Sequence, residues 1–241
     1  MGESFDLAPP PLGNRLLDAL PQEKRESLAS NLRPVEFRPH DLLYEPGRRI
    51  GKVYFPQSGV ISLMAPLLNG EAIETATIGN EGMLGINVFL GGGTYGAGIA
   101  MAQVAGRGLY MSADAFRAEI AGDGKLRELL LGYTQALFAQ ISQSVACNGT
   151  HSIQQRCARW LLETHDRAGS DQFVLTQEFL ADMLAVRRPS VTVAAGILQK
   201  AGLIEYRRGQ IIILDRMGLE AASCECYQAI LDAYDTFVPI P

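Results

Sequence analysis

The stretch TQEFLADMLAVRRPSVTVAAGILQKAGL, residues 176–203, contains two helical patterns separated by a short interruption. Apolar residues recur at helical spacing in the first pattern, and Thr176 precedes them as an N-cap whose hydroxyl can accept a backbone N–H. Pro189 suits the first turn of a second helix, and Gly202 suits the left-handed residue that ends it. Two short helices joined by about three residues predict a helix-turn-helix.

The second helix begins with a polar, basic segment, Arg187-Arg188-Pro189-Ser190-Val191-Thr192, and continues with an apolar face. In DNA-binding versions of the motif, the first residues of this helix face base edges in the major groove. An arginine fork matches two acceptors of guanine, and hydroxyl side chains can bind phosphates. The pattern therefore favours DNA binding, and the alternative is a motif that contacts another protein.

Two β-branched runs follow, at residues 203–206 and 210–214. They flank Arg207-Arg208-Gly209, a hairpin tip with glycine where a positive φ is needed. These elements complete a winged helix-turn-helix with two arginines on the wing. The residues expected to contact DNA are Thr176, Gln177, Arg187, Arg188, Ser190, Thr192, Arg207 and Arg208.

The net charge of −5 is unexpected for a protein that binds nucleic acid. The charge is unevenly distributed, however, because residues 151–216 hold 9 Lys and Arg against 7 Asp and Glu. Residues 1–150 hold 12 against 15, and residues 217–241 hold none against 4. The one net-positive region is thus the region with the predicted helix-turn-helix, where DNA binding needs it.

The composition, 47% hydrophobic and 20% charged over 241 residues, is typical of a globular protein of one large or two ordinary domains. No apolar run approaches the ~18 residues of a membrane span. The N-terminus lacks the apolar core of a signal peptide. We therefore expect a cytoplasmic protein without membrane contact.

Cysteines occur only in the second half of the chain, at Cys147, Cys157, Cys224 and Cys226. In a cytoplasmic protein they are expected to be reduced thiols. The pair Cys224-Glu225-Cys226 lacks the second ligand pair that a zinc site needs. His151 and His165 are the nearest further ligands, but we expect no metal site.

Upstream of residue 123 the sequence predicts a β-rich domain preceded by short helices. Residues 15–33 carry leucines at helical intervals, broken at Pro21. Short β-rich runs then alternate with Gly and Pro turns, which predicts a barrel or double-sheet roll. These runs are residues 42–44, 52–55, 59–64, 73–78, 99–104 and 108–111. Ser112 is expected to cap a helix over residues 113–120.

A longer helix is expected from Lys125 to Ala146, with an apolar stripe close to the coiled-coil period. Burial against its own domain is one interpretation of this stripe. Its position between a β domain and a DNA-binding domain favours a dimer seam, made of Leu126, Leu130, Tyr133, Leu137 and Ile141. A helix over residues 151–168 should place Trp160 in the core of the second domain, and an acidic helical segment, residues 218–236, closes the chain.

The order of β roll, long helix and winged helix-turn-helix resembles the cyclic-AMP receptor protein and fumarate–nitrate reduction regulator (Crp/Fnr) superfamily, from about Val35 onward. Its most specific segments are residues 175–181 with 186–191, and residues 42–47 with 53–59. The resemblance implies an α+β fold. Its parts would be a cyclic-nucleotide-binding-like β-roll domain at residues 1–122, a dimerisation helix at 123–148 and a winged helix-turn-helix domain at 149–241.

The same resemblance implies a homodimeric, sequence-specific transcription regulator that binds an inverted repeat in double-stranded DNA. RNA polymerase is a further candidate partner. In close relatives the residue that matches Arg188 contacts guanine. Pro189 and Val193 depart from the usual recognition helix, so the preferred DNA site should differ from that of the cyclic-AMP receptor.

The region that matches the effector pocket departs further from the family. A cyclic-nucleotide site of this family pairs the phosphate with an arginine, yet Lys52 is the only basic residue between Arg49 and Arg107. A buried phosphate needs such a partner. We therefore expect no cofactor, an unidentified effector that is not cyclic AMP, and an uncharged ligand or none in the roll.

Several residues are expected around this pocket. Glu81 would meet a ribose hydroxyl, and Met83, Leu84, Phe89 and Tyr95 would line the interior. The effector residues named by the resemblance are Glu81, Gly82, Met83, Thr94 and Tyr95.

These observations bear on three classes of function. A DNA-binding regulator is favoured, and a sensor or adaptor whose winged helix binds a protein is the alternative, against which Arg187 and Arg188 argue. An enzyme is disfavoured, because no Ser/His/Asp set, metal cluster or carboxylate pair is recognisable and only three histidines are present.

Overall fold

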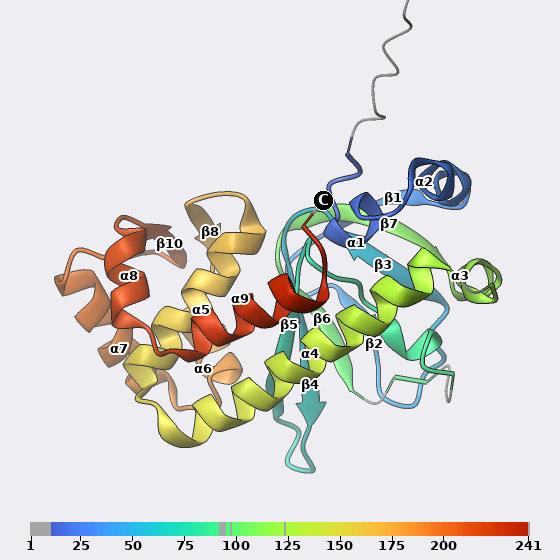
Figure 1. The fold of residues 1–241 in the computed structure, drawn as a ribbon. Helices are drawn as coiled ribbons and strands as arrows, with labels where there is room; N and C mark the ends of the chain where they lie inside the picture. Colours follow the sequence, from blue (N-terminus) through green and yellow to red (C-terminus); the bar gives the residue numbers. More distant parts are fainter. Residues whose placement is uncertain (1–10, 92–94, 97, 123, 241) are drawn as a thin grey trace, which may run out of the picture.

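The computed structural model describes residues 11–91, 95–96, 98–122 and 124–240. An N-terminal β domain and a C-terminal domain of helices and a small sheet lie side by side, and the long helix α4 (Lys125–Thr150) runs along both (Figure 1). This α+β architecture confirms the fold class predicted from the sequence. No helix of the described residues is long and apolar enough to cross a membrane.

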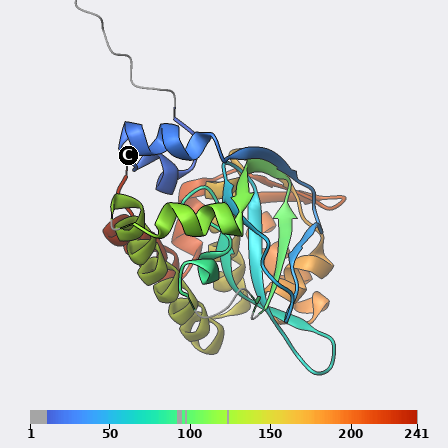
Figure 2. The same cartoon turned by 90° about the vertical axis from the view of Figure 1, so that its right-hand side faces the viewer.

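The β domain is built from two antiparallel sheets, here called the β roll (residues 33–112; Figure 2). One sheet has the order β2-β6-β4-β5, from Leu42–Tyr44, Ile99–Val104, Val60–Pro66 and Ala72–Ile78. The other has the order β1-β7-β3, from Arg33–Phe37, Gly106–Ser112 and Lys52–Pro56. The double-sheet roll is therefore confirmed, with β1 as an additional strand. Apolar side chains of the two sheets pack together inside, among them Phe37, Tyr54, Ile61, Ile78 and Leu84.

Short helices close the ends of the β roll. Helices α1 (Arg15–Asp18) and α2 (Gln22–Ala29) precede it, η1 (Ile86–Val88) lies within it, and α3 (Ala113–Ile120) follows it. The Ser112 hydroxyl accepts a hydrogen bond from the Ala115 N–H at 3.1 Å, which confirms the expected cap. The buried Asn14 amide donates to the carbonyls of Pro56 and Gly82, each at 2.8 Å, and so fixes α1 to the roll.

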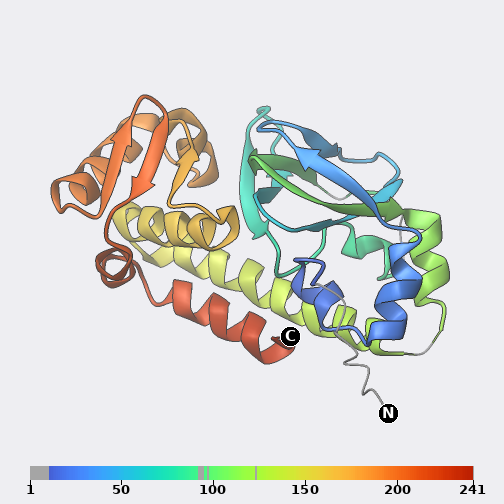
Figure 3. The same ribbon diagram turned by 90° about the horizontal axis from the view of Figure 1, so that it is seen from above.

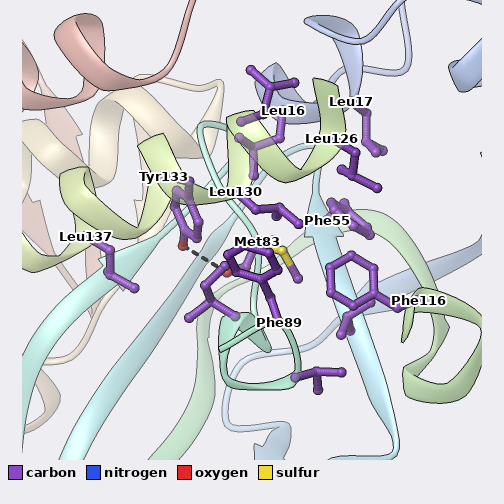
Figure 4. Packing of buried hydrophobic residues seen from close by; sticks show 14 of the residues in the cluster. Leu16, Leu17, Phe55, Met83, Phe89, Phe116, Leu126, Leu130, Tyr133 and Leu137 are labelled. Atoms are coloured by element: carbon purple, nitrogen blue, oxygen red, sulfur yellow. Dashed lines mark hydrogen bonds between the residues drawn. The ribbon is translucent and has the colours of Figure 1, made fainter. Parts of the chain in front are cut away.

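Helix α4 covers the open side of the β roll with its most apolar face (Figure 4). Tyr133 is fully buried, and its hydroxyl donates to the Met83 carbonyl at 2.8 Å. The sequence-based assignment of this stripe to a dimer seam was therefore wrong, because the apolar edge of the roll needs a cover and the chain supplies its own. The stripe consists of Leu126, Leu130, Tyr133 and Leu137, which are buried, and Ile141, which is half-buried.

The opposite face of α4 is exposed and also partly apolar. Leu131, Phe138 and Val145 follow one another at intervals of seven residues and are 49%, 71% and 69% exposed. A seven-residue repeat keeps side chains on one line along a helix that pairs with another helix. Leu131, Phe138 and Val145 thus form an exposed apolar line on α4, here called the exposed seam.

The chain ends with α8 (Arg216–Ala222) and α9 (Cys226–Phe237), and α9 returns to lie alongside α4 (Figure 3). Gly132 permits the close approach, since a Cβ there would meet the Phe237 carbonyl oxygen at 2.1 Å. Ile230, Tyr234 and Val238 are part of the same buried cluster as the β-roll face. Helix α9, which the sequence assigned to the DNA-binding domain with the rest of residues 149–241, therefore contributes to the N-terminal core, while its Tyr227 packs in the core of the C-terminal domain.

The C-terminal domain consists of α5 (Ile153–Ala168), β8 (Gln172–Val174), α6 (Gln177–Met183), α7 (Arg188–Lys200), β9 (Ile204–Arg207) and β10 (Gln210–Ile213). Its three strands form an antiparallel sheet in the order β8-β10-β9. Trp160 of α5 is buried, as predicted. Its cluster also includes Val60, Met64 and Val104 of the β roll, so the two domains share this core.

Candidate functional site

Helices α6 and α7 form the predicted helix-turn-helix. The Thr176 hydroxyl accepts the Phe179 N–H at 3.2 Å, which confirms the cap at the start of α6. The connection includes Ala185 in the left-handed region with φ of 50°, and Gly202 has φ of 75° directly after α7. The start of α6 and the end of α7 therefore lie where the sequence predicted them.

The second helix, α7, separates a buried face from an exposed polar start. Its buried residues are Val191, Ala194, Ala195 and Leu198. Arg187, Arg188 and Thr192 are exposed, and Ser190 is half-buried. The Thr192 hydroxyl donates to Gln177 Oε1 at 2.8 Å, which joins the exposed sides of the two helices. The structure thus groups most of the predicted DNA-contacting residues at the start of α7 and the adjoining start of α6.

The wing is a two-residue hairpin between β9 and β10. Gln210 pairs with Arg207, so Arg208 and Gly209 form the turn, with φ of 51° and 77°. Two positive φ values match a type I′ turn, which usually contains Asn or Gly. An arginine at the first position is conformationally unfavourable, and its exposed side chain points to a role in binding. Arg207 is exposed as well.

A cleft of about 1140 Å³ lies between the helix-turn-helix and the β roll. Arg187 and Arg188 contribute to it from the C-terminal domain, and His40 and Glu71 from the β domain. The rings of His40 and Phe179 meet edge-on at 5.4 Å between centroids. In this arrangement the β domain therefore stands directly beside the two arginines.

The domains are joined by buried polar contacts as well as by apolar packing. Trp160 Nε1 donates to Glu74 Oε1 at 2.8 Å, and Gln103 Nε2 donates to Glu74 Oε2 at 3.1 Å. The Ser62 hydroxyl donates to the same carboxylate. Burial outweighs these hydrogen bonds and raises the pKa of Glu74 to about 7. This carboxyl group therefore titrates near neutral pH at the domain interface.

Glu81 belongs to this interface and not to an effector pocket. Its carboxylate binds Arg167 Nε of α5 at 2.9 Å and accepts the Gly79 N–H at 3.0 Å. Arg167 also lies 3.5 Å from Glu163, which is hydrogen-bonded to Thr77 of the β roll at 3.2 Å. The carboxylate expected to meet a ribose hydroxyl is thus paired in this structure with a guanidinium of the same chain.

The β roll contains a cavity of about 390 Å³ that opens beside α4. Met83 and Leu84 line it as expected, whereas Phe89 packs in the core under α4 and Tyr95 is exposed outside it. Gly82 lies against the Tyr133 ring, and Thr94 falls outside the described residues. None of the described lining residues is charged. The lining includes Tyr44, Leu63, Ile78, Thr134, Leu137, Phe138 and Ile141.

Three cysteines and a histidine, distant in sequence, come together at the end of α4. Cys147, His151, Cys224 and Cys226 place their ligand atoms within 4.8 Å of one another. A hydrogen bond from Cys224 lowers the pKa of the Cys147 thiol. The sequence-based expectation that the Cys224–Cys226 pair lacks partners was wrong, because the packing of α9 on α4 supplies two more ligands.

The remaining candidates from the sequence lie elsewhere. His165 Nε2 binds Asp171 at 2.7 Å and its Nδ1 lies 2.8 Å from Arg216. Cys157 is buried in the core of the C-terminal domain. Neither residue belongs to the cysteine–histidine cluster.

Comparison with known proteins agrees with this geometry. Residues 155–222 match the sequence model of the Crp-like helix-turn-helix domain. No curated protein matches the chain by sequence. Over most of its length, however, the chain shares its fold with solved structures of bacterial regulators.

FixK2 from Bradyrhizobium japonicum superimposes with a TM-score of 0.67 at 18% identity, covering 80% of this chain and 98% of that chain. A CRP-family transcriptional regulator from Thermus thermophilus gives 0.64 at 20% identity, covering 78% and 96%. The c-di-GMP-responsive global regulator CLP from Xanthomonas campestris gives 0.62 at 15% identity, covering 80% and 99%. The chain thus shares its overall fold with these Crp/Fnr-type structures, and residues 155–222 match the Crp-like helix-turn-helix domain.

The Glu74 carboxyl group gives the protein a pH-dependent stability. Its pKa lies above the ordinary 4.5 in the folded state, so the unfolded chain loses this proton at lower pH than the folded chain does. The contribution of Glu74 to stability is therefore complete below pH 4.5 and is lost as pH rises toward 7. A shift of this size corresponds to a loss on the order of 3 kcal/mol at most.

Glu74→Gln, which imitates the protonated acid, should flatten this part of the stability profile in urea denaturation measured from about pH 5 to 8. Glu71→Gln, at an exposed site before the same strand, should retain the slope of the unmodified protein. Equal slopes for Glu74→Gln and the unmodified protein would contradict the assignment.

Proposed function

We propose that the protein is a transcription regulator that binds double-stranded DNA through α7 and the wing. The observation that carries this proposal is the exposed start of α7, where Arg187, Arg188 and Thr192 project while the remainder of the helix is anchored in the core. Such a start is the part of a recognition helix that meets base edges. Thr176 and Gln177 lie beside it and are suited to phosphate contacts.

The wing supports the same proposal by an independent route. Arg208 occupies a turn position that usually contains Asn or Gly, and its positive φ is energetically unfavourable for an arginine. A phosphate contact by the wing accounts for an arginine there. A protein-binding adaptor would not need basic side chains on both the recognition helix and the wing.

Arg188→Ala should weaken binding to the specific DNA site by about 1–3 kcal/mol and relax the preference at one base pair, because a bidentate contact with guanine is lost. Arg208→Asn should weaken binding to all duplexes alike and reduce the salt dependence, because a phosphate contact is lost while the turn is preserved. Fluorescence anisotropy with specific and scrambled duplexes at several salt concentrations measures both effects.

Arg107→Ala is the matched control, because it removes an equally exposed arginine from the β domain. It should leave both affinities close to those of the unmodified protein. A uniform loss for Arg188→Ala, equal on specific and scrambled DNA, would contradict its role in reading a base. Unchanged DNA binding in both Arg188→Ala and Arg208→Asn would instead favour the adaptor.

We further propose that the regulator is a homodimer joined through the exposed seam of α4. A second copy is the occupant that fits Leu131, Phe138 and Val145, since two such helices bring identical apolar lines together. The symmetry of that pairing gives two recognition helices related by a two-fold axis. Such a dimer reads an inverted repeat with half-sites about 34 Å apart.

Phe138→Glu should convert the dimer to a monomer and abolish the preference for an inverted repeat over a single half-site, because two buried charges would face each other across the seam. Light scattering coupled to size exclusion gives the mass, and anisotropy gives the affinities. Leu68→Glu places the same charge at a fully exposed turn and should remain dimeric. A dimeric Phe138→Glu protein would contradict the proposed seam.

The cavity beside α4 suits an uncharged effector, and we propose that cyclic AMP is not the ligand. A cyclic phosphate carries a full charge that is tolerated inside a protein only when it is paired. The described lining contains no charged side chain, and Glu81 is already bound to Arg167. Phe138 lines the cavity and also belongs to the exposed seam, so an occupant would act directly on the dimer contact.

Isothermal titration of the purified protein with cyclic AMP should give no binding, because the phosphate would be buried without a cation. DNA affinity measured with and without the nucleotide should be equal. Micromolar binding together with tighter DNA binding would contradict this prediction. Titration with the neutral nucleoside adenosine separates rejection of the phosphate from rejection of the base.

A further inference from the structure

The cysteine–histidine cluster lies where three parts of the chain meet. Cys147 is in the last turns of α4, and His151 directly follows this helix before α5 begins. Cys224 and Cys226 lie in the connection from α8 to α9 and in the first residue of α9. All three thiols are buried and form a cluster of their own, separate from the hydrophobic cores.

The distances within this cluster match a tetrahedron around one ion. Cys147 Sγ and Cys224 Sγ are 3.5 Å apart, and Cys226 Sγ and His151 Nδ1 are 3.4 Å apart. Zinc–sulfur bonds of about 2.3 Å and zinc–nitrogen bonds of about 2.1 Å give edges of about 3.5–3.8 Å in a tetrahedron. All four ligand atoms lie within 4.8 Å of one another, so a small movement completes the geometry.

The surrounding side chains complete the arrangement of a metal site. With Nδ1 facing Cys226 Sγ, His151 Nε2 lies 3.2 Å from Glu225 Oε1. A carboxylate on the outer nitrogen is the usual means of orienting a histidine ligand. Gln143 Nε2 lies 3.1 Å from Cys226 Sγ and can donate to a thiolate there. The neighbouring guanidiniums of Arg156 and Arg159 are buried, and each has an Nε without a hydrogen-bond partner among the described residues.

We propose that Cys147, His151, Cys224 and Cys226 bind one zinc ion. Three thiolates and one imidazole are a ligand set of structural zinc sites, which have four protein ligands and no open position. The set is compact enough for a single ion and leaves no room for the several atoms of an iron–sulfur cluster between its ligands. The proposal concerns the ligands alone and does not depend on DNA binding.

The position of the ion indicates what it would do. Cys147 and Cys224 are 77 residues apart, so the ion closes a long loop and fastens the start of α9 to the end of α4. His151 lies in the short link between α4 and α5, where the C-terminal domain joins the long helix. Zinc therefore fixes that link, and its binding is coupled to the folding of this junction.

The experiment uses the full chain, purified without chelators and with a reducing agent, and measures zinc by elemental analysis. We expect about one zinc ion per chain, a site of structural type. After removal of the metal, cobalt(II) should restore a tetrahedral spectrum with sulfur-to-metal charge-transfer bands, and zinc should displace it. These spectra test the site without any substitution.

Variants then assign the ligands. Cys226→Ser should lower the intensity of the charge-transfer bands and reduce zinc affinity by at least about 100-fold, and Glu225→Gln should reduce it by about 10–100-fold. Cys157→Ala is the matched control, because it removes the one cysteine outside the cluster and should leave zinc content unchanged. Circular dichroism of each variant checks that it is folded.

Three outcomes would overturn the proposal. One is that the reduced, unmodified protein takes up no zinc and gives no tetrahedral cobalt spectrum. A second is that Cys157→Ala loses zinc while Cys226→Ser retains it. Mass spectrometry showing a Cys147–Cys224 disulfide in protein that does not bind zinc after reduction would assign the cluster to redox chemistry and would equally overturn it.

Discussion

The packing of α4 on the open side of the β roll is the contact on which the rest of the structure depends. Tyr133 is buried there with its hydroxyl bound to the Met83 carbonyl, and the leucines on either side close the core. Because one face of the helix packs on the roll and the neighbouring face on α9, the large hydrophobic residues of the described part of α4 that remain exposed are Leu131, Phe138 and Val145. The burial of the other faces of α4 within its own chain thus determines which apolar surface of the helix is available to a second chain.

The second constraint is the buried polar contact between α5 and the β roll. Arg167 is buried and pairs with Glu81 and with Glu163, so removing Arg167 would leave two carboxylates without this partner. Such contacts favour one arrangement of the two domains, in which Arg187 and Arg188 stand beside the β roll. Glu74 lies in the same interface, and burial raises its pKa to about 7, so its protonation state changes near neutral pH at the contact with Trp160 of α5.

Local features were readable from the sequence, whereas contacts between distant segments were not. The Thr176 cap, the hairpin at Gly209 and most strands follow from periodicity and turn residues, but β1 was missed because Pro34 and Glu36 interrupt an apolar run. Periodicity reveals that a helix has an apolar face, not which segment covers it, so the α4 stripe was assigned to the wrong contact. The ion pair between Glu81 and Arg167 joins residues more than 70 positions apart, and so does the contact between Cys147 and Cys224. No local sequence pattern indicates either contact.

Helix α4 contributes residues to the β-roll cavity, to the exposed seam and to the cysteine–histidine cluster. Phe138 lines the β-roll cavity and belongs to the proposed dimer seam, so a ligand that moved this side chain would alter the proposed pairing of two chains. The far end of the same helix carries Cys147, and the link that follows carries His151 and leads into α5. The proposed metal ion would hold that link to the start of α9 and so restrict movement of the C-terminal domain relative to α4. A site with four protein ligands and no open position suits such a structural role at the junction, because it holds three separate parts of the chain together.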